Sequence, residues 1–291
     1  MSIDILQEKI RKVKNPSVLY LEALPQLIPP HIVQQSSSAS EACGLFHREL
    51  LDGLKGTLSA VRFGLGSYAL LGSDGLAALS RLLIHAKQQG YYVLLDMPEM
   101  LSGMAAKNAA TVLGQERSPY PCDGVVLSCY LGSDVIRPFL ELCKAEKTVF
   151  PVVRTANKTA PELQDLLTGA RLVHTAAADI INRHGEGTVG RCGYSQVGAV
   201  AAASAADSLR ALRSKYKRMF LLLDGYDYPN ANAKNCGYAF DSLGHGAAAC
   251  AGTSIAGAWA EAQSDGTDFV AHAVQAAQRM KKNLTRYVSV L

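Results

Sequence analysis

The sequence predicts one α/β domain over residues 1–291, a single closed (β/α)8 barrel of the TIM class. Short apolar runs alternate with amphipathic segments along the whole chain, and eight such runs can be counted. The run Tyr91–Leu95 is apolar throughout, which is typical of a parallel strand covered on both faces. Strict alternation of strand and helix indicates a parallel sheet, and eight units indicate that the sheet closes into a barrel.

The strands are predicted where β-rich apolar runs follow turn residues. They are expected to begin at Ser17, Ala60, Tyr91, Gly124, Thr148, Val197, Met219 and Gly246. The run from Val197 is alanine-rich and fits a helix nearly as well as a strand.

Helices are predicted between the strands. The expected ranges are 4–13, 31–54 with a break at residues 36–38, 75–89, 105–113, 135–147, 161–168, 172–184, 205–216 and 267–287. The segment 75–89 shows the pattern best, because leucines recur at helical spacing and Gly90 follows its last turn. Residues 25–30 cannot be helical throughout, since prolines interrupt them.

Composition excludes several functional classes. The net charge of +4 is small for 291 residues and Lys and Arg form no long stripe, so we expect no nucleic-acid partner. Seven scattered cysteines form no CxxC pair and no metal-type spacing, which favours a reduced compartment with no metal or cofactor. The charged N-terminal segment is not a signal peptide, and no apolar run approaches the length of a membrane span. We therefore expect a soluble cytoplasmic protein.

The barrel mouth, where the strands end, is the expected functional region. Asp96 directly follows the run Tyr91–Leu95, and α/β barrels hold their chemistry at this end of the strands. Asp96 is either a catalytic carboxylate or the cap of the following turn. The polar and aromatic loop 224–232 is either a binding loop or a solvated one.

Other candidates are weaker. Lys107 could supply an ammonium group near Asp96, but a lysine within a helix is usually solvated. Cys129 and Cys250 are expected near the mouth, with no neighbouring base to activate a thiol. His184 and Glu186 show no metal spacing and no triad order.

Five stretches, in the right order, together resemble one known family. They are residues 3–32, CDGVVLSCYLGSDVIRPF (122–139), VVRTANKTAPELQDL (152–166), GYSQVGAV (193–200) and GYAFDSLGHGAAACAG (237–252). The chain resembles orotidine 5′-phosphate decarboxylase, in its longer bacterial form, over essentially its whole length. The resemblance implies a TIM barrel, a carboxy-lyase (lyase) activity in the UMP-forming step of pyrimidine biosynthesis, and no cofactor.

The resemblance also locates the family's reactive array, and this chain departs from it. The family carries Asp-x-Lys-x-x-Asp after its third strand, with the lysine as proton donor. Here Asp96 is the only retained member, while Pro98 stands at the lysine position and Leu101 at the second aspartate. The resemblance therefore implies a degenerate array.

Most of the other family positions are substituted too. The first-strand aspartate is Glu22, the second-strand lysine is Arg62 and the fifth-strand serine is Ala156. The phosphate-binding glutamine and arginine correspond to Pro229 and Thr253. The substrate-binding positions that the resemblance assigns are Glu22, Arg62, Ser128, Thr155, Asn157, Gly225 and Thr253.

Two hypotheses for function follow. The chain is a decarboxylase by descent, or it is a non-catalytic relative (a pseudoenzyme) that binds another small ligand or a protein at the mouth. The resemblance implies a dimer through mouth-side loops, either a homodimer or a heterodimer with an active paralogue. Because a buried charge needs a partner, we predict that Arg62 contacts Asp96, Glu22 or both.

Overall fold

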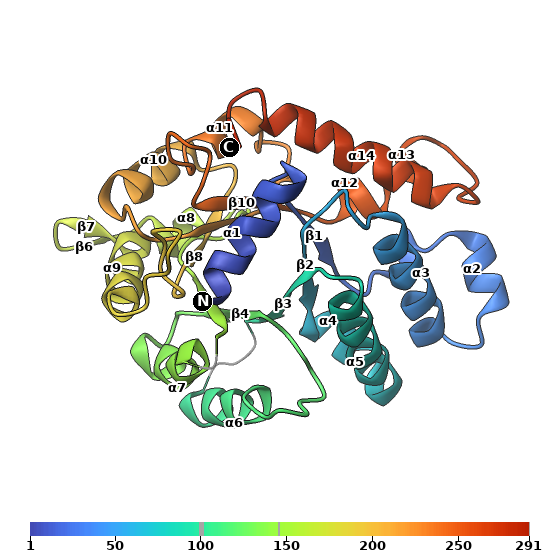
Figure 1. The fold of residues 1–291 in the computed structure, drawn as a ribbon, viewed down its shortest axis with the longest axis horizontal. Coiled ribbons are helices and arrows are strands. Elements are labelled where there is room, and N and C mark those ends of the chain that lie inside the picture. The colour runs from blue at the N-terminus through green and yellow to red at the C-terminus, as the bar shows by residue number, and fades with distance from the viewer. Residues whose placement is uncertain (99–101, 145, 291) are drawn as a thin grey trace.

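Eight parallel strands close into a barrel in the computed structural model, which describes residues 1–98, 102–144 and 146–290 (Figure 1). Around the barrel the order is β1, β2, β3, β4, β5, β8, β9, β10 and back to β1. The strands are β1 (Ser17–Leu21), β2 (Ala60–Gly64), β3 (Tyr92–Met97), β4 (Gly124–Ser128), β5 (Thr148–Val152), β8 (Ala199–Ala202), β9 (Leu221–Asp224) and β10 (Ala247–Ala251). The predicted fold class is confirmed, and the alanine-rich run is a strand.

Helices surround the barrel. They are α1 (Ser2–Val13), α2 (Pro30–Gln35), α3 (Ala39–Gly53), α4 (Leu65–Ala69), α5 (Gly72–Gln88), α6 (Gly103–Leu113), α7 (Ser133–Lys144), α8 (Pro161–Gln164), α9 (Val173–Gly185), α10 (Ala206–Lys215), α11 (Ala233–Gly237), α12 (Thr253–Ala256), α13 (Ala258–Glu261) and α14 (Phe269–Leu284), with a 3-10 turn at Pro25–Leu27. The described helices include none that is long and apolar enough to cross a membrane.

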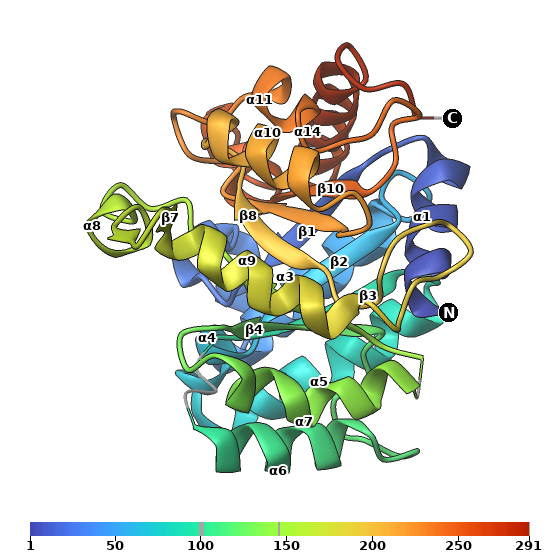
Figure 2. The same cartoon turned by 90° about the vertical axis from the view of Figure 1, so that its left-hand side faces the viewer.

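Helix α1 closes the end of the barrel where the strands begin (Figures 1 and 2). Its buried residues Ile3, Leu6 and Ile10 join the same apolar cluster as Tyr92 of β3 and Phe220, which directly precedes β9. The Ser2 hydroxyl lies 2.8 Å from the Tyr92 hydroxyl. With this end filled, a ligand can reach the barrel interior only from the mouth at the other end.

One predicted helix is wrong in part. Residues 161–168 were expected to be helical, but α8 ends at Gln164 and Leu167–Thr168 (β6) pairs antiparallel with Arg171–Leu172 (β7). Gly169 has a φ of 65°, which favours glycine and lets the chain reverse within two residues. The resulting hairpin projects from the barrel beside α8 (Figure 2). The short helices α4, α11, α12 and α13 were not predicted either.

Candidate functional site at the barrel mouth

Four strands bring one cation, two carboxylates and a phenol together at the mouth. Tyr20 of β1 and Arg62 of β2 lie opposite each other in the sheet, and Asp96 of β3 lies opposite Gly64 of β2. Asp224 is the last residue of β9, which is separated from β1 by β10. Parallel strands all end at the same rim, so these side chains can converge.

Arg62 and Asp96 form a buried ion pair, with 4% and 3% of their side chains exposed. The guanidinium donates from Nη2 at 2.6 Å and from Nε at 3.1 Å to the same oxygen, Oδ2 of Asp96. The Tyr20 hydroxyl donates to that oxygen as well, at 2.8 Å. Asp96 Oδ1 is buried and has no hydrogen-bond partner among the described residues. The predicted contact of Arg62 with Asp96 is confirmed.

A second carboxylate completes the surroundings of Arg62. Asp224 accepts a hydrogen bond from Nη1 at 3.3 Å, and the guanidinium lies 4.4 Å from the centre of the Tyr20 ring. Among the described residues no ion pair joins Arg62 to Glu22. The second carboxylate that Arg62 contacts is Asp224, and not Glu22, the other partner named in the prediction. Sequence reasoning missed Asp224 as a partner because it is 162 residues from Arg62 along the chain.

The electrostatics follow from burial. Burial lowers the pKa of Arg62, but the carboxylates of Asp96 and Asp224 reverse this and hold it above its ordinary value. Burial raises the pKa of Asp96, while Arg62 opposes that rise. Burial and the nearby Asp96 carboxylate also raise the pKa of Glu22. Arg62 therefore stays charged and is a poor proton donor. The raised pKa of Glu22 can be tested by measuring how the stability of a Glu22 variant depends on pH.

A second polar contact links the loop after β9 to the loop after β10. The Asp227 carboxylate accepts hydrogen bonds from the backbone N–H groups of Gly252 at 2.6 Å, Thr253 at 3.1 Å and Ser254 at 3.4 Å. The Ser254 hydroxyl also donates to it. Consecutive N–H groups of this kind form an anion-binding concavity, and here the anion is a side chain of the same chain.

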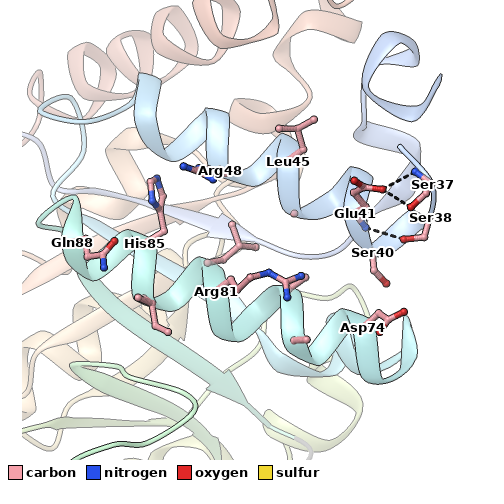
Figure 3. A pocket seen from close by; sticks show the side chains of 15 residues that line it. Ser37, Ser38, Ser40, Glu41, Leu45, Arg48, Asp74, Arg81, His85 and Gln88 are labelled. Carbon is pink, nitrogen blue, oxygen red and sulfur yellow. Dashed lines mark hydrogen bonds between the residues drawn. The ribbon is translucent and has the colours of Figure 1, made fainter. Parts of the chain in front are cut away.

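One cavity that the described residues form at the rim of the mouth is small. The described residues enclose about 50 Å³ between Tyr20, Glu22, His47, Asp227 and Thr253. Small-molecule sites usually measure about 300–1,000 Å³. A larger cavity, about 700 Å³, lies on the outside of the barrel between α3 and α5 (Figure 3).

His47 lies beside this cavity in an apolar setting that the sequence did not reveal. Its Nδ1 is 2.7 Å from the Tyr68 hydroxyl and 3.4 Å from Cys43 Sγ. Burial lowers the pKa of His47 to about 3 and raises the pKa of the Cys43 thiol to about 12. Both groups are therefore neutral at pH 7, and no activated thiolate forms here.

The predicted substrate-binding residues at the end of β4 and after β5 form hydrogen bonds within their own loops. Ser128 Oγ accepts from the N–H of Tyr130 at 3.2 Å, and Thr155 donates to Asn157 at 2.5 Å. Gly225 has a φ of 74°, and a Cβ built on it would lie 2.3 Å from Ala156. Gly225 directly follows Asp224 of the Arg62 cluster, whereas the printed contacts of Ser128, Thr155 and Asn157 stay within their own loops. Thr253 contributes only its backbone to the Asp227 contact.

Of the weaker candidates, Cys250 lies beside Arg62 in the cluster, whereas Lys107, Cys129 and His184 make their contacts elsewhere. Lys107 is exposed in a groove between α6 and α7, outside the barrel. Cys129 donates to the Val152 carbonyl, and burial raises the thiol pKa of Cys129 to about 11 and of Cys250 to about 12. His184 contacts Ser133 at 3.0 Å. Pro98 follows β3 directly, whereas Leu101 lies outside the described residues.

No group of three or more metal-binding side chains occurs in residues 1–98, 102–144 and 146–290. The described residues therefore supply no ligand set for a metal ion.

Comparison with known proteins shows the ancestry. The orotidine 5′-phosphate decarboxylase of Rhodopirellula baltica is 28% identical over 233 residues, which cover 78% of this chain and 77% of the relative. That of Clostridium acetobutylicum is 28% identical over 237 residues, covering 80% and 82%. This chain is a homologue of the orotidine 5′-phosphate decarboxylases. No family model matches it.

The fold of this decarboxylase homologue agrees with that ancestry. The structure of Leishmania donovani OMP decarboxylase superimposes with a TM-score of 0.74 at 20% identity, over 97% of this chain and 98% of the other. The likeness shows that the two chains share the barrel fold.

The buried pair predicts a large loss of stability when Arg62 is replaced. Arg62→Met leaves the Asp96 carboxylate buried without its cation, so the free energy of unfolding should fall by about 3–5 kcal/mol in a denaturant titration. Arg154→Met is a matched control, because Arg154 forms a two-bond pair with the more exposed Asp165. The free energy of unfolding of this control variant should fall clearly less than that of Arg62→Met. An Arg62→Met protein as stable as wild type would contradict a structural role for the pair.

The raised pKa of Glu22 predicts a pH-dependent effect of Glu22→Gln. A carboxyl whose pKa is higher in the folded state binds protons more strongly there, so its contribution to stability falls as pH rises through the folded pKa. Glu22→Gln should therefore raise the melting temperature at neutral pH, and the gain should disappear at pH values where an ordinary glutamate is protonated. A gain that grows on acidification would contradict the direction of the shift.

Proposed function

We propose that this decarboxylase homologue, which descends from an enzyme of UMP biosynthesis, does not decarboxylate orotidine 5′-phosphate. The observation that supports this most strongly is Pro98 at the position of the family's proton-donating lysine. Proline has no titratable side chain and cannot protonate a carbanion. Among the described residues, the cation paired with Asp96 is the guanidinium of Arg62, and no lysine ammonium forms an ion pair with it.

Arg62 does not replace that lysine. Its three nitrogens donate to Asp96 and Asp224, and the two carboxylates hold its pKa above the ordinary arginine value. A group that retains its proton so strongly is a poor general acid near pH 7. The pair stabilises the mouth instead of moving a proton.

The mouth is also unsuited to a phosphate group. Thr253 replaces the family's arginine, and the carboxylate of Asp227 already accepts the hydrogen bonds of the N–H groups at 252–254. A phosphate placed there would have to displace that carboxylate and would meet the negative charge of Asp227. Losing one charged hydrogen bond alone costs about 1.5–3 kcal/mol.

A second function, binding of a protein at the mouth, is favoured by the exposed apolar side chains around it. Leu70, Met104, Tyr130 and Leu167 follow β2, β3, β4 and β5 and are 89%, 69%, 73% and 75% exposed. Apolar residues gathered on one face often mark an interface. We propose that this face pairs with a second copy, or with an active paralogue, in the cytoplasm.

The proposal predicts no measurable turnover. Protein purified from a host that lacks its own orotidine 5′-phosphate decarboxylase should release no carbon dioxide from the substrate above the background of an Asp96→Asn control. The gene should also fail to restore growth of that host without added pyrimidine. Turnover by wild type that the Asp96→Asn substitution abolishes would overturn the proposal.

UMP should bind weakly or not at all in a calorimetric titration, because Thr253 lacks a cation and Asp227 occupies the N–H groups. Asp227→Asn removes the negative charge while keeping the side-chain shape, and should bind UMP more tightly than wild type. A micromolar dissociation constant for wild type would refute this account of the mouth.

A further inference from the structure

The outer face of α3 and α5 carries a hollow of about 700 Å³, far larger than the cavity at the mouth. Its lining combines small, apolar and charged side chains from both helices (Figure 3). We call it the α3–α5 face and define it by the lining residues Glu41, Gly44, Leu45 and Arg48 of α3 and Asp74, Ala77, Ala78, Arg81, Ile84 and His85 of α5. It lies on the side of the barrel and shares no residue with the mouth cluster.

The two helices of this face run parallel and approach closely at their centre. Ser40, near the start of α3, donates to the Leu71 carbonyl just before α5, and Asp52 lies 2.6 Å from His85 near both helix ends. In the middle, a Cβ built on Gly44 would lie 3.8 Å from that of Ala78. Small residues therefore form the floor of a shallow groove that runs along both helices.

Charges on this face are arranged symmetrically about that centre. Glu41 and Arg48 lie on either side of Gly44 on α3, and Asp74 and Arg81 lie on either side of Ala78 on α5. Each pair is seven residues apart, which is two helical turns or about 10 Å. Figure 3 shows Glu41 and Asp74 at one end of the groove and Arg48 at the other, with Arg81 between.

The charged side chains of these two pairs form no ion pair with another described residue. Arg48, Arg81 and Asp74 are exposed, and none of them forms an ion pair with another described residue. Glu41 accepts only from the N–H and hydroxyl of Ser37 and from no cation among the described residues. The exposed Ile84, at 43%, adds an apolar side chain beside them.

We propose that the α3–α5 face binds the same face of a second copy about a two-fold axis. An axis that lies in the interface, perpendicular to both helices and level with Gly44 and Ala78, places α5 antiparallel to the partner's α5 and α3 antiparallel to its counterpart. Each Arg81 then meets the Asp74 of the other copy, and each Arg48 meets the other copy's Glu41. Two-fold interfaces are self-complementary in this way.

The same geometry disfavours the alternative orientation. A two-fold axis parallel to the helices would keep all four helices parallel and place acidic ends on acidic ends. The antiparallel arrangement also sets helix N-termini against C-termini, which is favourable for the helix dipoles. Its product is a four-helix layer in which the exposed charges of the two copies meet across the axis.

The size of the face sets the expected strength. A surface about 25 Å long and two helices wide covers on the order of 500 Å² per copy, so the total is near the lower limit of about 1,000 Å² for specific interfaces. Because much of the contact is between exposed charges, salt should weaken it. We therefore expect association that depends on both protein concentration and ionic strength.

Sedimentation velocity with charge-reversal variants tests the proposal. Arg81→Glu and Asp74→Arg each create like-charge contacts across the axis, so each protein should show half the mass of wild type at equal concentration and low salt. An equimolar mixture of the two variants should recover the wild-type mass, because position 81 of one variant and position 74 of the other then carry opposite charges where they meet. The double variant Arg81→Glu/Asp74→Arg should recover it on its own.

The control is Arg279→Glu, a reversal at an exposed position of α14 outside this face, which should leave the mass unchanged. Circular dichroism confirms that each variant is folded. A dimer that formed through the mouth face would keep its mass in these variants, because the substituted residues lie outside the mouth. A halved mass therefore tests the α3–α5 face separately from the proposed function. Equal masses for wild type and Arg81→Glu would overturn the proposal, as would variants that separate but do not reassociate on mixing.

Discussion

The buried pair of Arg62 and Asp96 is the constraint on which the rest of the mouth depends. A carboxylate with 3% of its side chain exposed is tolerated only beside a cation, and a guanidinium with 4% exposed needs acceptors for its donors. The two side chains therefore require Tyr20 and Asp224 at fixed positions on β1 and β9. Through these contacts one ion pair joins strands that begin more than two hundred residues apart along the chain.

Asp227 imposes a second constraint on the same opening. By accepting the N–H groups of Gly252, Thr253 and Ser254, it ties the loop after β9 to the loop after β10. The two sets of contacts act on neighbouring parts of the rim, and a cavity of about 50 Å³ lies between Tyr20, Glu22 and Asp227. Arg62, Asp96, Tyr20 and Asp224 therefore bind one another, while Asp96 Oδ1 is a buried acceptor without a partner among the described residues.

The sequence allowed the barrel to be predicted because most strands and most helices are specified by local patterns, the alanine-rich β8 being the ambiguous one. The apolar run before Asp96 and the leucine spacing of α5 depend only on neighbouring residues. The hairpin at Leu167–Leu172 was mistaken for helix, since a single glycine at 169 decides it.

At the mouth, the Arg62–Asp96 contact could be predicted because sequential barrel strands are neighbours. The roles of Asp224 and Asp227 could not, because they depend on how loops distant in the chain fold over the rim. The neutral state of His47 was likewise hidden, since it follows from burial that no local pattern shows.

The central claim is that Asp96 stabilises the fold through its buried pair with Arg62. The most direct measurement is a double-mutant cycle for the free energy of unfolding with Arg62→Met, Asp96→Asn and the double variant. We predict that the double variant is markedly more stable than the sum of the two single losses implies, with a coupling of about 1–3 kcal/mol. Losses that add within about 0.5 kcal/mol would show that the two residues do not depend on each other, and would contradict the account.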